Sequence, residues 1–264
     1  MIFKNNPFVF ATALFALLSF NVQSTIVEIR TSLGVVEVNL FDNTTPATVD
    51  NFLSYVNSGA YFNNVVHRSV GGFIVQAGGY QYNGPITGSF ALDEIEKGSS
   101  VVNEPKLSNV RGTIAMAKLS NQANSATSEW FINLSDNSAN LDLQNSGFTV
   151  FGQVTEEGMQ IIDAIADLSL MNAGGAFSDL PIRNYTQEDV DNDEPITDEN
   201  LVIISDVVVI DSDVATAANL NPATNTLITA SNGGGDSGSG GGAFGWLLLL
   251  GGLAMVYRNR QLKS

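Results

Sequence analysis

The 264-residue sequence contains no cysteine and only one histidine, His67. Without cysteine the chain has no disulfide framework, no thiolate nucleophile and no cysteine-bound metal. A single histidine also cannot build a multi-histidine metal site. These absences argue against most hydrolases and metalloenzymes, and we expect no cofactor and no bound metal.

Basic residues are also scarce: 11 Lys and Arg stand against 27 Asp and Glu, which gives a formal net charge of -16. Such a surface repels a phosphate backbone, so we expect no nucleic-acid partner. Hydrophobic residues make up 44% of the chain and charged residues 14%. That balance supplies a globular core and carries too little charge for a disordered chain.

The first 24 residues have the pattern of an export signal. Lys4 precedes an apolar run over residues 8–20, and the stretch ends at Ser24. The run has no amphipathic period, which argues against a buried helix or strand. The sequence therefore predicts a signal peptide over residues 1–24, with cleavage after Ser24.

The last 52 residues divide into three parts. Residues 213–242 read as a flexible linker rich in Gly and Ser, residues 243–257 are apolar, and residues 258–264 are basic. This order is typical of a tail that enters a membrane with its positive end in the cytoplasm, although 15 apolar residues are few for a permanent span. The tail over residues 243–264 resembles the GlyGly-CTERM sorting signal of some Gram-negative bacteria. The resemblance implies cleavage by a rhomboid-type protease, after contact with the export machinery. We expect a protein of the periplasm or cell envelope, either tethered to the membrane or released.

Between these ends the pattern predicts one mainly β domain over residues 25–212. Runs at 26–30 and 35–40 predict a hairpin, and short apolar runs at 110–117, 129–134, 148–154 and 201–210 predict further strands. Thr45 and Thr155 are candidate caps of two amphipathic helices, at 46–58 and 156–168. Many strands with two helices favour a closed barrel whose open ends the helices cover.

The most informative stretch is residues 65–79, where an alternating strand presents His67-Arg68 and a glycine turn leads to Phe73 and Gln76. An arginine beside aromatic surface indicates peptide binding only weakly, since a structural salt bridge is the ordinary alternative. The order His67-Arg68, Gly72-Phe73, Gln76 and Gly78-Gly79 resembles the cyclophilins at unbroken spacing. Further matching blocks follow in order at 103–104, 107–109, 111–117, 125–128, 131–133 and 150–152.

The resemblance covers about residues 25–211. It implies an eight-stranded antiparallel β-barrel capped by two α-helices, and peptidyl-prolyl cis-trans isomerase activity (EC 5.2.1.8) that assists the folding of exported proteins. The partners would be proline-containing polypeptides, and the default state of such a fold is a monomer.

The resemblance also assigns roles to individual residues. Arg68 would donate a hydrogen bond to the prolyl nitrogen in the twisted state while Gln76 holds the guanidinium. His67 would orient the site, because the reaction has no proton to abstract. Met116 and Ala117 would form the groove edge for the substrate backbone. The proline pocket would consist of Phe73, Ile74, Phe131 and Leu141, although Ile74 and Leu141 are equally consistent with ordinary core packing.

Three positions depart from the family pattern. Glu129 stands where glutamine is usual, and it would either position Arg68 by a salt bridge or hold it away from substrate. Asn140 replaces an aromatic residue at the groove rim, and Phe148 takes a place often filled by His or Tyr. These changes keep open a second hypothesis, a non-catalytic peptide-binding or chaperone module on the same fold.

An acidic run at residues 188–194 begins like a calcium-binding loop. However, Glu194 stands where the required glycine should be, and Asn200 replaces the closing glutamate. We therefore expect a solvated acidic insertion before the last strand.

Overall fold

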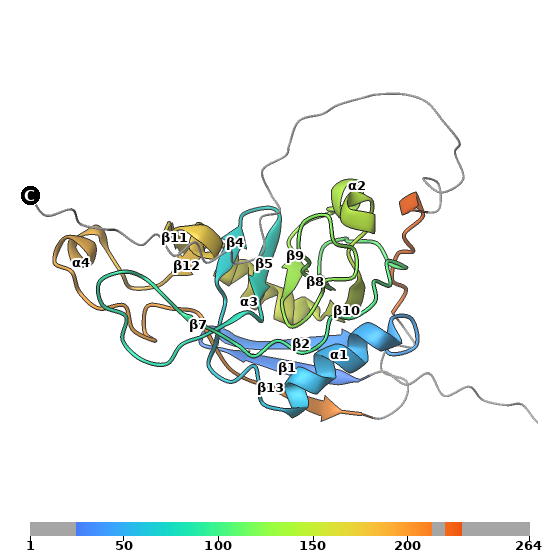
Figure 1. Ribbon diagram of the computed structural model, residues 1–264, viewed down its shortest axis with the longest axis horizontal. Coiled ribbons are helices and arrows are strands. Elements are labelled where there is room, and N and C mark those ends of the chain that lie inside the picture. The colour runs from blue at the N-terminus through green and yellow to red at the C-terminus, as the bar shows by residue number, and fades with distance from the viewer. Residues whose placement is uncertain (1–24, 213–219, 229–264) are drawn as a thin grey trace, which may run out of the picture.

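The computed structural model describes residues 25–212 and 220–228 (Figure 1). The expected signal peptide, most of the expected linker and the apolar tail lie outside these residues. Within the two described ranges, no helix is both long and apolar enough to cross a membrane.

The domain is mainly β. Its principal strands form one antiparallel sheet in the order β4-β5-β9-β8-β10-β2-β1-β13-β3-β6-β7. The bounds are β1 (Ile26–Thr31), β2 (Gly34–Leu40), β3 (Asn64–Val65), β4 (Arg68–Val70), β5 (Ile74–Ala77), β6 (Tyr80–Gln81), β7 (Asp93–Glu94), β8 (Thr113–Met116), β9 (Trp130–Asn133), β10 (Val150–Val154) and β13 (Ile203–Asp211).

Two bent segments close this sheet into a barrel. β3 and β4 follow each other along the chain, yet β3 pairs with β13 and β4 pairs with β5. In the same way β5 pairs with β9, and β6, beyond Gly78-Gly79, pairs with β3. Counting each bent segment as one strand gives eight barrel strands, with β7 added at the edge. The expected eight-stranded antiparallel barrel is confirmed.

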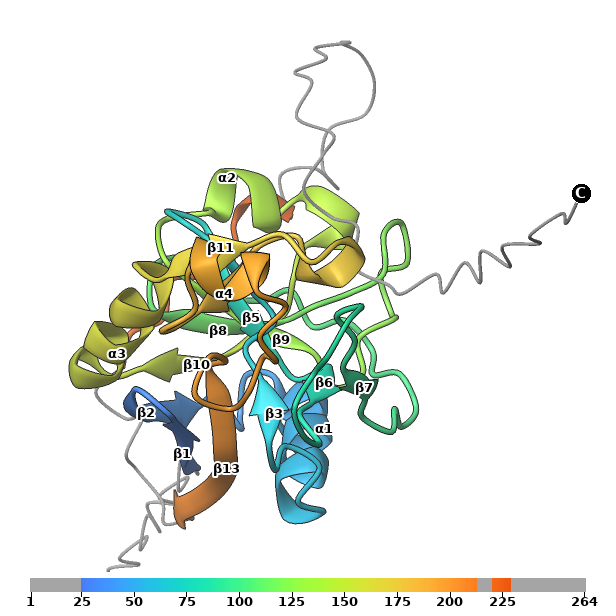
Figure 2. The ribbon, with the colours of Figure 1, turned by 90° about the vertical axis from the view of Figure 1, so that its left-hand side faces the viewer.

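Two longer helices lie on opposite sides of the strands (Figure 2): α1 (Pro46–Asn57) and α3 (Glu156–Ala166). Each buries one apolar face, for example Phe52 in α1 and Ile162 in α3. Thr155 caps α3 as predicted, because its side chain accepts a hydrogen bond from the Gly158 amide at 3.2 Å. Thr45 is the N-cap residue of α1, as predicted, but its hydroxyl makes no capping hydrogen bond and donates to the Phe41 carbonyl instead. Two short turns of helix, α2 (Ser138–Leu141) and the 3-10 helix Gln144–Ser146, precede β10.

Alternation along the strands sorts the apolar side chains onto two faces. Val75, Met116 and Ile132 belong to the inner cluster, which fills the barrel and packs against α1 and α3. Their chain neighbours face the other way and form what we call the outer cluster. Its buried members are Phe41, Ile74, Leu107, Ala115, Ala117, Phe131, Leu141, Phe148 and Val150, with Phe73 and Leu220 packed against them.

Residues 167–202, which we call the insertion, join α3 to β13 and pack in a third apolar cluster together with Val65, Ile203 and the loop at residues 82–92. They contain a small sheet of β11 (Ser169–Met171) and β12 (Leu180–Ile182), the 3-10 helix Gly175–Phe177, and α4 (Gln187–Asp191). The acidic run that resembled a calcium loop begins α4 instead, where Thr186 and Asp189 form a reciprocal capping box. The expected acidic insertion is thus an ordered unit.

Residues 220–228 fall within the range expected as linker, yet they lie against the domain, and we call them the strap. Thr224 bridges Leu107 in antiparallel fashion. Asn225 is 3% exposed, and its side-chain amide donates to the Asp142 carbonyl at 3.0 Å. Figure 1 shows the strap and the insertion at opposite ends of the long axis.

Candidate active site

Arg68 lies on β4 directly opposite Gln76 on β5. The residue is only 8% exposed, and its Nη1 donates to Gln76 Oε1 at 3.5 Å. Burial lowers the pKa of the guanidinium from its usual value, because a charge loses hydration there, and the carboxylate of Asp179 partly offsets that effect. Strand pairing therefore fixes the Arg68–Gln76 contact that the sequence predicted.

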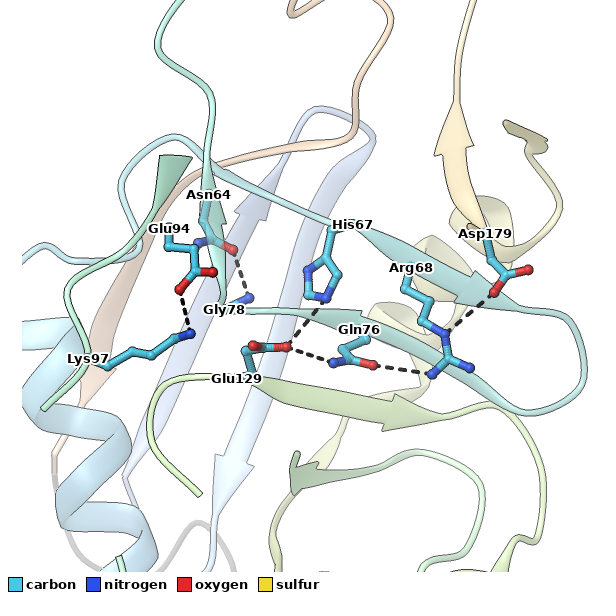
Figure 3. A network of polar contacts seen from close by, with 9 residues as sticks. All are labelled: Asn64, His67, Arg68, Gln76, Gly78, Glu94, Lys97, Glu129 and Asp179. Carbon is cyan, nitrogen blue, oxygen red and sulfur yellow. Dashed lines mark hydrogen bonds and ion pairs between the residues drawn. The ribbon is translucent and has the colours of Figure 1, made fainter. Parts of the chain in front are cut away.

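Asp179 approaches Arg68 from the insertion. Its Oδ2 lies 3.5 Å from Arg68 Nε, and its backbone carbonyl accepts a hydrogen bond from the Ser69 amide at 2.8 Å. The guanidinium thus has Gln76 near one nitrogen and Asp179 near another (Figure 3). No hydrogen bond from its Nη2 to another described residue is present. Nη2 is therefore the guanidinium nitrogen without a partner among the described residues.

Glu129 lies on the far side of Gln76 from Arg68 (Figure 3). Its Oε2 accepts a hydrogen bond from Gln76 Nε2 at 2.9 Å and lies 3.5 Å from His67 Nε2. Burial raises the pKa of this carboxyl, but His67 and the Gln76 amide outweigh that effect and leave the pKa below its ordinary value. Among the residues placed here, Glu129 makes no ion pair with Arg68, so neither form of the expected Glu129–Arg68 salt bridge is present.

His67 is fully buried behind this network. Its ring packs edge-on against Tyr80 at 4.9 Å and against Phe177 of the insertion at 6.4 Å, measured between ring centroids. Its Nε2 lies 3.5 Å from Glu129 Oε2, and neither ring nitrogen has a hydrogen-bond partner among the described residues. His67 is therefore positioned mainly by its aromatic contacts, and its orienting role stays a prediction.

The outer cluster gathers the apolar residues assigned to the proline pocket. Phe131 and Phe148 meet edge-to-face at 5.8 Å, and Phe73 lies partly exposed at the margin. The remaining assigned members, Ile74 and Leu141, are 2% and 1% exposed. The four residues assigned to the pocket and Phe148 therefore belong to one apolar cluster, of which Phe73 is the partly exposed member.

Met116 and Ala117, the two residues expected at the groove edge, belong to different clusters. Ala117 belongs to the outer cluster, whereas Met116 is fully buried in the inner cluster and its side chain faces the barrel interior. Asn140 is exposed, which agrees with a groove rim that has lost apolar surface.

Lys118, which follows Ala117, is a residue that the sequence did not single out. Its Nζ lies 4.8 Å from the centroid of the Phe148 ring and donates to the carbonyls of Asn145 at 2.8 Å and Gly147 at 2.7 Å. Burial lowers its pKa to about 8. A cavity of ≈ 130 Å³ beside it is lined by Lys97, Ala117, Lys118, Leu119, Ser125, Thr127 and Glu129.

Asp179 and Phe177 were also missed. They lie more than 100 residues after Arg68 in a segment outside the matching motifs, so no spacing pattern links them to it; only the fold shows the contact. In the described part of the chain, no three His, Cys, Asp or Glu side chains come together in a way that could hold a metal ion. The site therefore consists of the polar network around Arg68 and the outer cluster.

Comparison with known proteins gives three kinds of match. A family profile described as "Cyclophilin type peptidyl-prolyl cis-trans isomerase/CLD" matches residues 26–187. Among curated proteins, a peptidyl-prolyl cis-trans isomerase of Acinetobacter baylyi is 37% identical over 154 residues, covering 57% of this chain and 77% of the relative. Peptidyl-prolyl cis-trans isomerase A of Dickeya dadantii is 41% identical over 157 residues, covering 57% and 76%. A solved cyclophilin type isomerase of Cryptosporidium parvum gives a TM-score of 0.49 at 21% identity, covering 71% of this chain and 98% of that one.

Proposed function

Since the chain belongs to the cyclophilin type peptidyl-prolyl cis-trans isomerase family, we propose that it uses Arg68 to accelerate rotation about the peptide bond preceding proline. The activity of the family is peptidyl-prolyl isomerisation (EC 5.2.1.8), and its substrates are proline-containing peptides. The observation that supports Arg68 is its placement: a buried guanidinium, held on two sides, lies on the strand that leads to Phe73 and the outer cluster.

Rotation about this bond meets a barrier of about 18–20 kcal/mol, because the C–N bond is partly double. No covalent bond between the enzyme and the peptide has to form. As the peptide twists, conjugation is lost and the prolyl nitrogen gains a lone pair that can accept a hydrogen bond. A permanently charged donor held in place stabilises this state more than the planar ground state. Nη2 of Arg68 is the arm free to supply that bond.

The outer cluster would hold the proline side of the substrate. Phe73, the partly exposed member of this cluster, would contact the proline ring, with the buried Phe131 and Phe148 packed beneath it, while the preceding residue rotates past Arg68. Gln76 and Glu129 lie in order behind the guanidinium. The site thus combines an apolar clamp with one directed donor.

Replacing Arg68 by alanine tests this proposal. We expect Arg68→Ala to lower kcat/KM for a proline tetrapeptide by about 100-fold or more, the scale seen when a transition-state donor is removed. Arg30→Ala is the matched control, because Arg30 is exposed and pairs only with Glu28. Wild-type turnover retained in Arg68→Ala would contradict the proposed role.

The same assay addresses the peptide-binding or chaperone alternative. That alternative is favoured if the wild-type protein binds proline peptides without accelerating their isomerisation, and if Arg68→Ala binds them equally well. Rapid isomerisation by the wild-type protein rules it out.

We further propose that the protein acts on exported polypeptides in the periplasm or cell envelope of a Gram-negative bacterium. Support comes from residues 1–24, which have the pattern of a signal peptide, and from the Gly-rich, apolar and basic order of residues 233–264. A rhomboid-type protease would process the tail. Intact-mass measurement of protein from native cells checks both cuts, and retention of Trp246 would contradict the sorting-signal proposal.

A further inference from the structure

The insertion is attached to the barrel directly beside Arg68. The Ser69 amide donates to the Asp179 carbonyl at 2.8 Å, and β12 begins at the next residue. Phe177 packs edge-on against Tyr80 at 4.7 Å and against His67. One backbone hydrogen bond and two aromatic contacts of Phe177 therefore fix the position of Asp179 independently of its side chain.

The side chain of Asp179 completes a row of polar groups along the site. From one end to the other the row runs His67, Glu129, Gln76, Arg68 and Asp179 (Figure 3). Two carboxylates thus lie at opposite ends of the Gln76–Arg68 pair. Asp179 contacts Nε of Arg68, which is the nitrogen that points away from Gln76.

A guanidinium that is 8% exposed has lost most of its hydration and requires a nearby negative charge. Asp179 supplies this charge at 3.5 Å. If its charge were removed, the remaining carboxylate of the row would be Glu129, on the far side of Gln76. The cation would then turn toward Glu129 or toward solvent, and Nη2 would lose its fixed direction. Displacements of about 1 Å in such donors cost up to 100-fold in rate.

We propose that Asp179 is a positioning residue, which holds the Arg68 guanidinium in its productive orientation and so makes the insertion part of the catalytic apparatus. This inference rests on the proposed role of Arg68. It assigns to the acidic insertion a function that its composition alone does not indicate.

Asp179→Asn tests the inference, because it keeps the shape of the side chain and removes its charge. The expected result is a loss of about tenfold in kcat with KM changed less than about twofold, since the apolar clamp stays intact. Asp179→Glu should recover most of the lost rate. Asp193→Asn is the matched control: it removes a charge from the same insertion, lies away from Arg68, and has φ +54°, which asparagine tolerates well.

The double variant separates the inference from the function on which it rests. If Asp179 acts through Arg68, Asp179→Asn should have no further effect in an Arg68→Ala background. Full activity of Arg68→Ala would overturn the proposed function itself. Loss of activity in Arg68→Ala together with wild-type kcat in Asp179→Asn would overturn only the positioning role. A loss shared equally by Asp193→Asn, or a fall in melting temperature large enough to account for it, would do the same.

Discussion

At the scale of single residues, the glutamate at position 129, where glutamine is expected, changes the contacts of Gln76 and not those of Arg68. An ionised carboxylate can only accept hydrogen bonds, so it obliges Gln76 to present Nε2 to Glu129 and Oε1 to Arg68. A glutamine at position 129 could satisfy Gln76 in either orientation. The glutamate therefore fixes the amide orientation that serves Arg68.

The lowered pKa of Glu129 predicts a pH dependence of stability. Because its pKa in the folded state lies below its ordinary value of 4.5, the carboxylate stabilises the fold above that value. This contribution is lost as the pH falls from 4.5 through the lower folded pKa. We expect the stability difference between wild type and Glu129→Gln to be larger at about pH 7 than at about pH 3.

Urea denaturation at the two pH values measures this difference. Glu96→Gln is the control, because Glu96 is exposed and lies outside the network. An equal difference at both pH values, or the same change in the control, would show that Glu129 is not held as an anion.

Most of the site at this scale could be predicted, because Arg68, Phe73, Gln76 and Phe131 belong to motifs with fixed spacing. Asp179 and Phe177 could not be predicted, because they reach the site through a segment with no motif. The contact of Glu129 with Gln76 in place of Arg68 also depended on the tertiary structure. Strand alternation directs the Met116 side chain into the barrel and places Ala117 in the outer cluster, and the groove edge expected at these two residues stays a prediction.

At the scale of elements, the barrel depends on the bend between β5 and β6. Gly78 at this bend has φ +89°, and a Cβ there would lie 2.5 Å from the Ser128 carbonyl oxygen. Its amide also donates to the Asn64 side chain at 2.8 Å, which joins the bend to β3. The bend therefore requires glycine both for its dihedral angle and for space.

Gly78→Ala should destabilise the domain by more than about 3 kcal/mol, because the left-handed dihedral and the backbone clash act together. Gly59→Ala is the matched control: its φ is +71°, but nothing lies within 4 Å of the added carbon. We expect it to cost about 1–2 kcal/mol, the dihedral cost alone. Chemical denaturation measures both values, and equal costs would mean that the bend can yield to the added methyl group.

The elements that could be predicted were those with long periodic patterns: the β1–β2 hairpin, α1, α3 and β13. The two-residue strands β3, β6 and β7 are too short to carry a period, and they are defined by their pairing across the barrel. The strap could not be predicted, because backbone hydrogen bonds, one buried asparagine and the single apolar contact of Leu220 leave no periodic pattern.

At the scale of the whole molecule, the formal net charge of -16 acts on every charged substrate that approaches. Fields of this kind raise encounter rates for oppositely charged partners and are screened by salt. The acidic insertion contacts Arg68 through Asp179, so the electrostatic effect should act at the site.

We therefore expect a proline peptide flanked by lysines to have a higher kcat/KM than one flanked by glutamates at about 0.01 M salt. The ratio should fall toward unity at about 1 M salt, where the Debye length shrinks to about 3 Å. A peptide with uncharged flanks should show little salt dependence. A ratio that stays constant across this range would show that charge does not steer substrates to the site.

The pairing of β13 with both β1 and β3 also determines when the molecule can become complete. Residues 203–211 must meet partners at 26–31 and 64–65, so these contacts span well over 100 residues of chain. Contacts of such high sequence separation slow folding, because a long loop must close before they form. Until β13 has been synthesised, the β1 edge of the β1–β2 hairpin would remain unpaired. The family accelerates a slow step in the folding of other proteins, and the topology of this barrel gives its own folding a slow step.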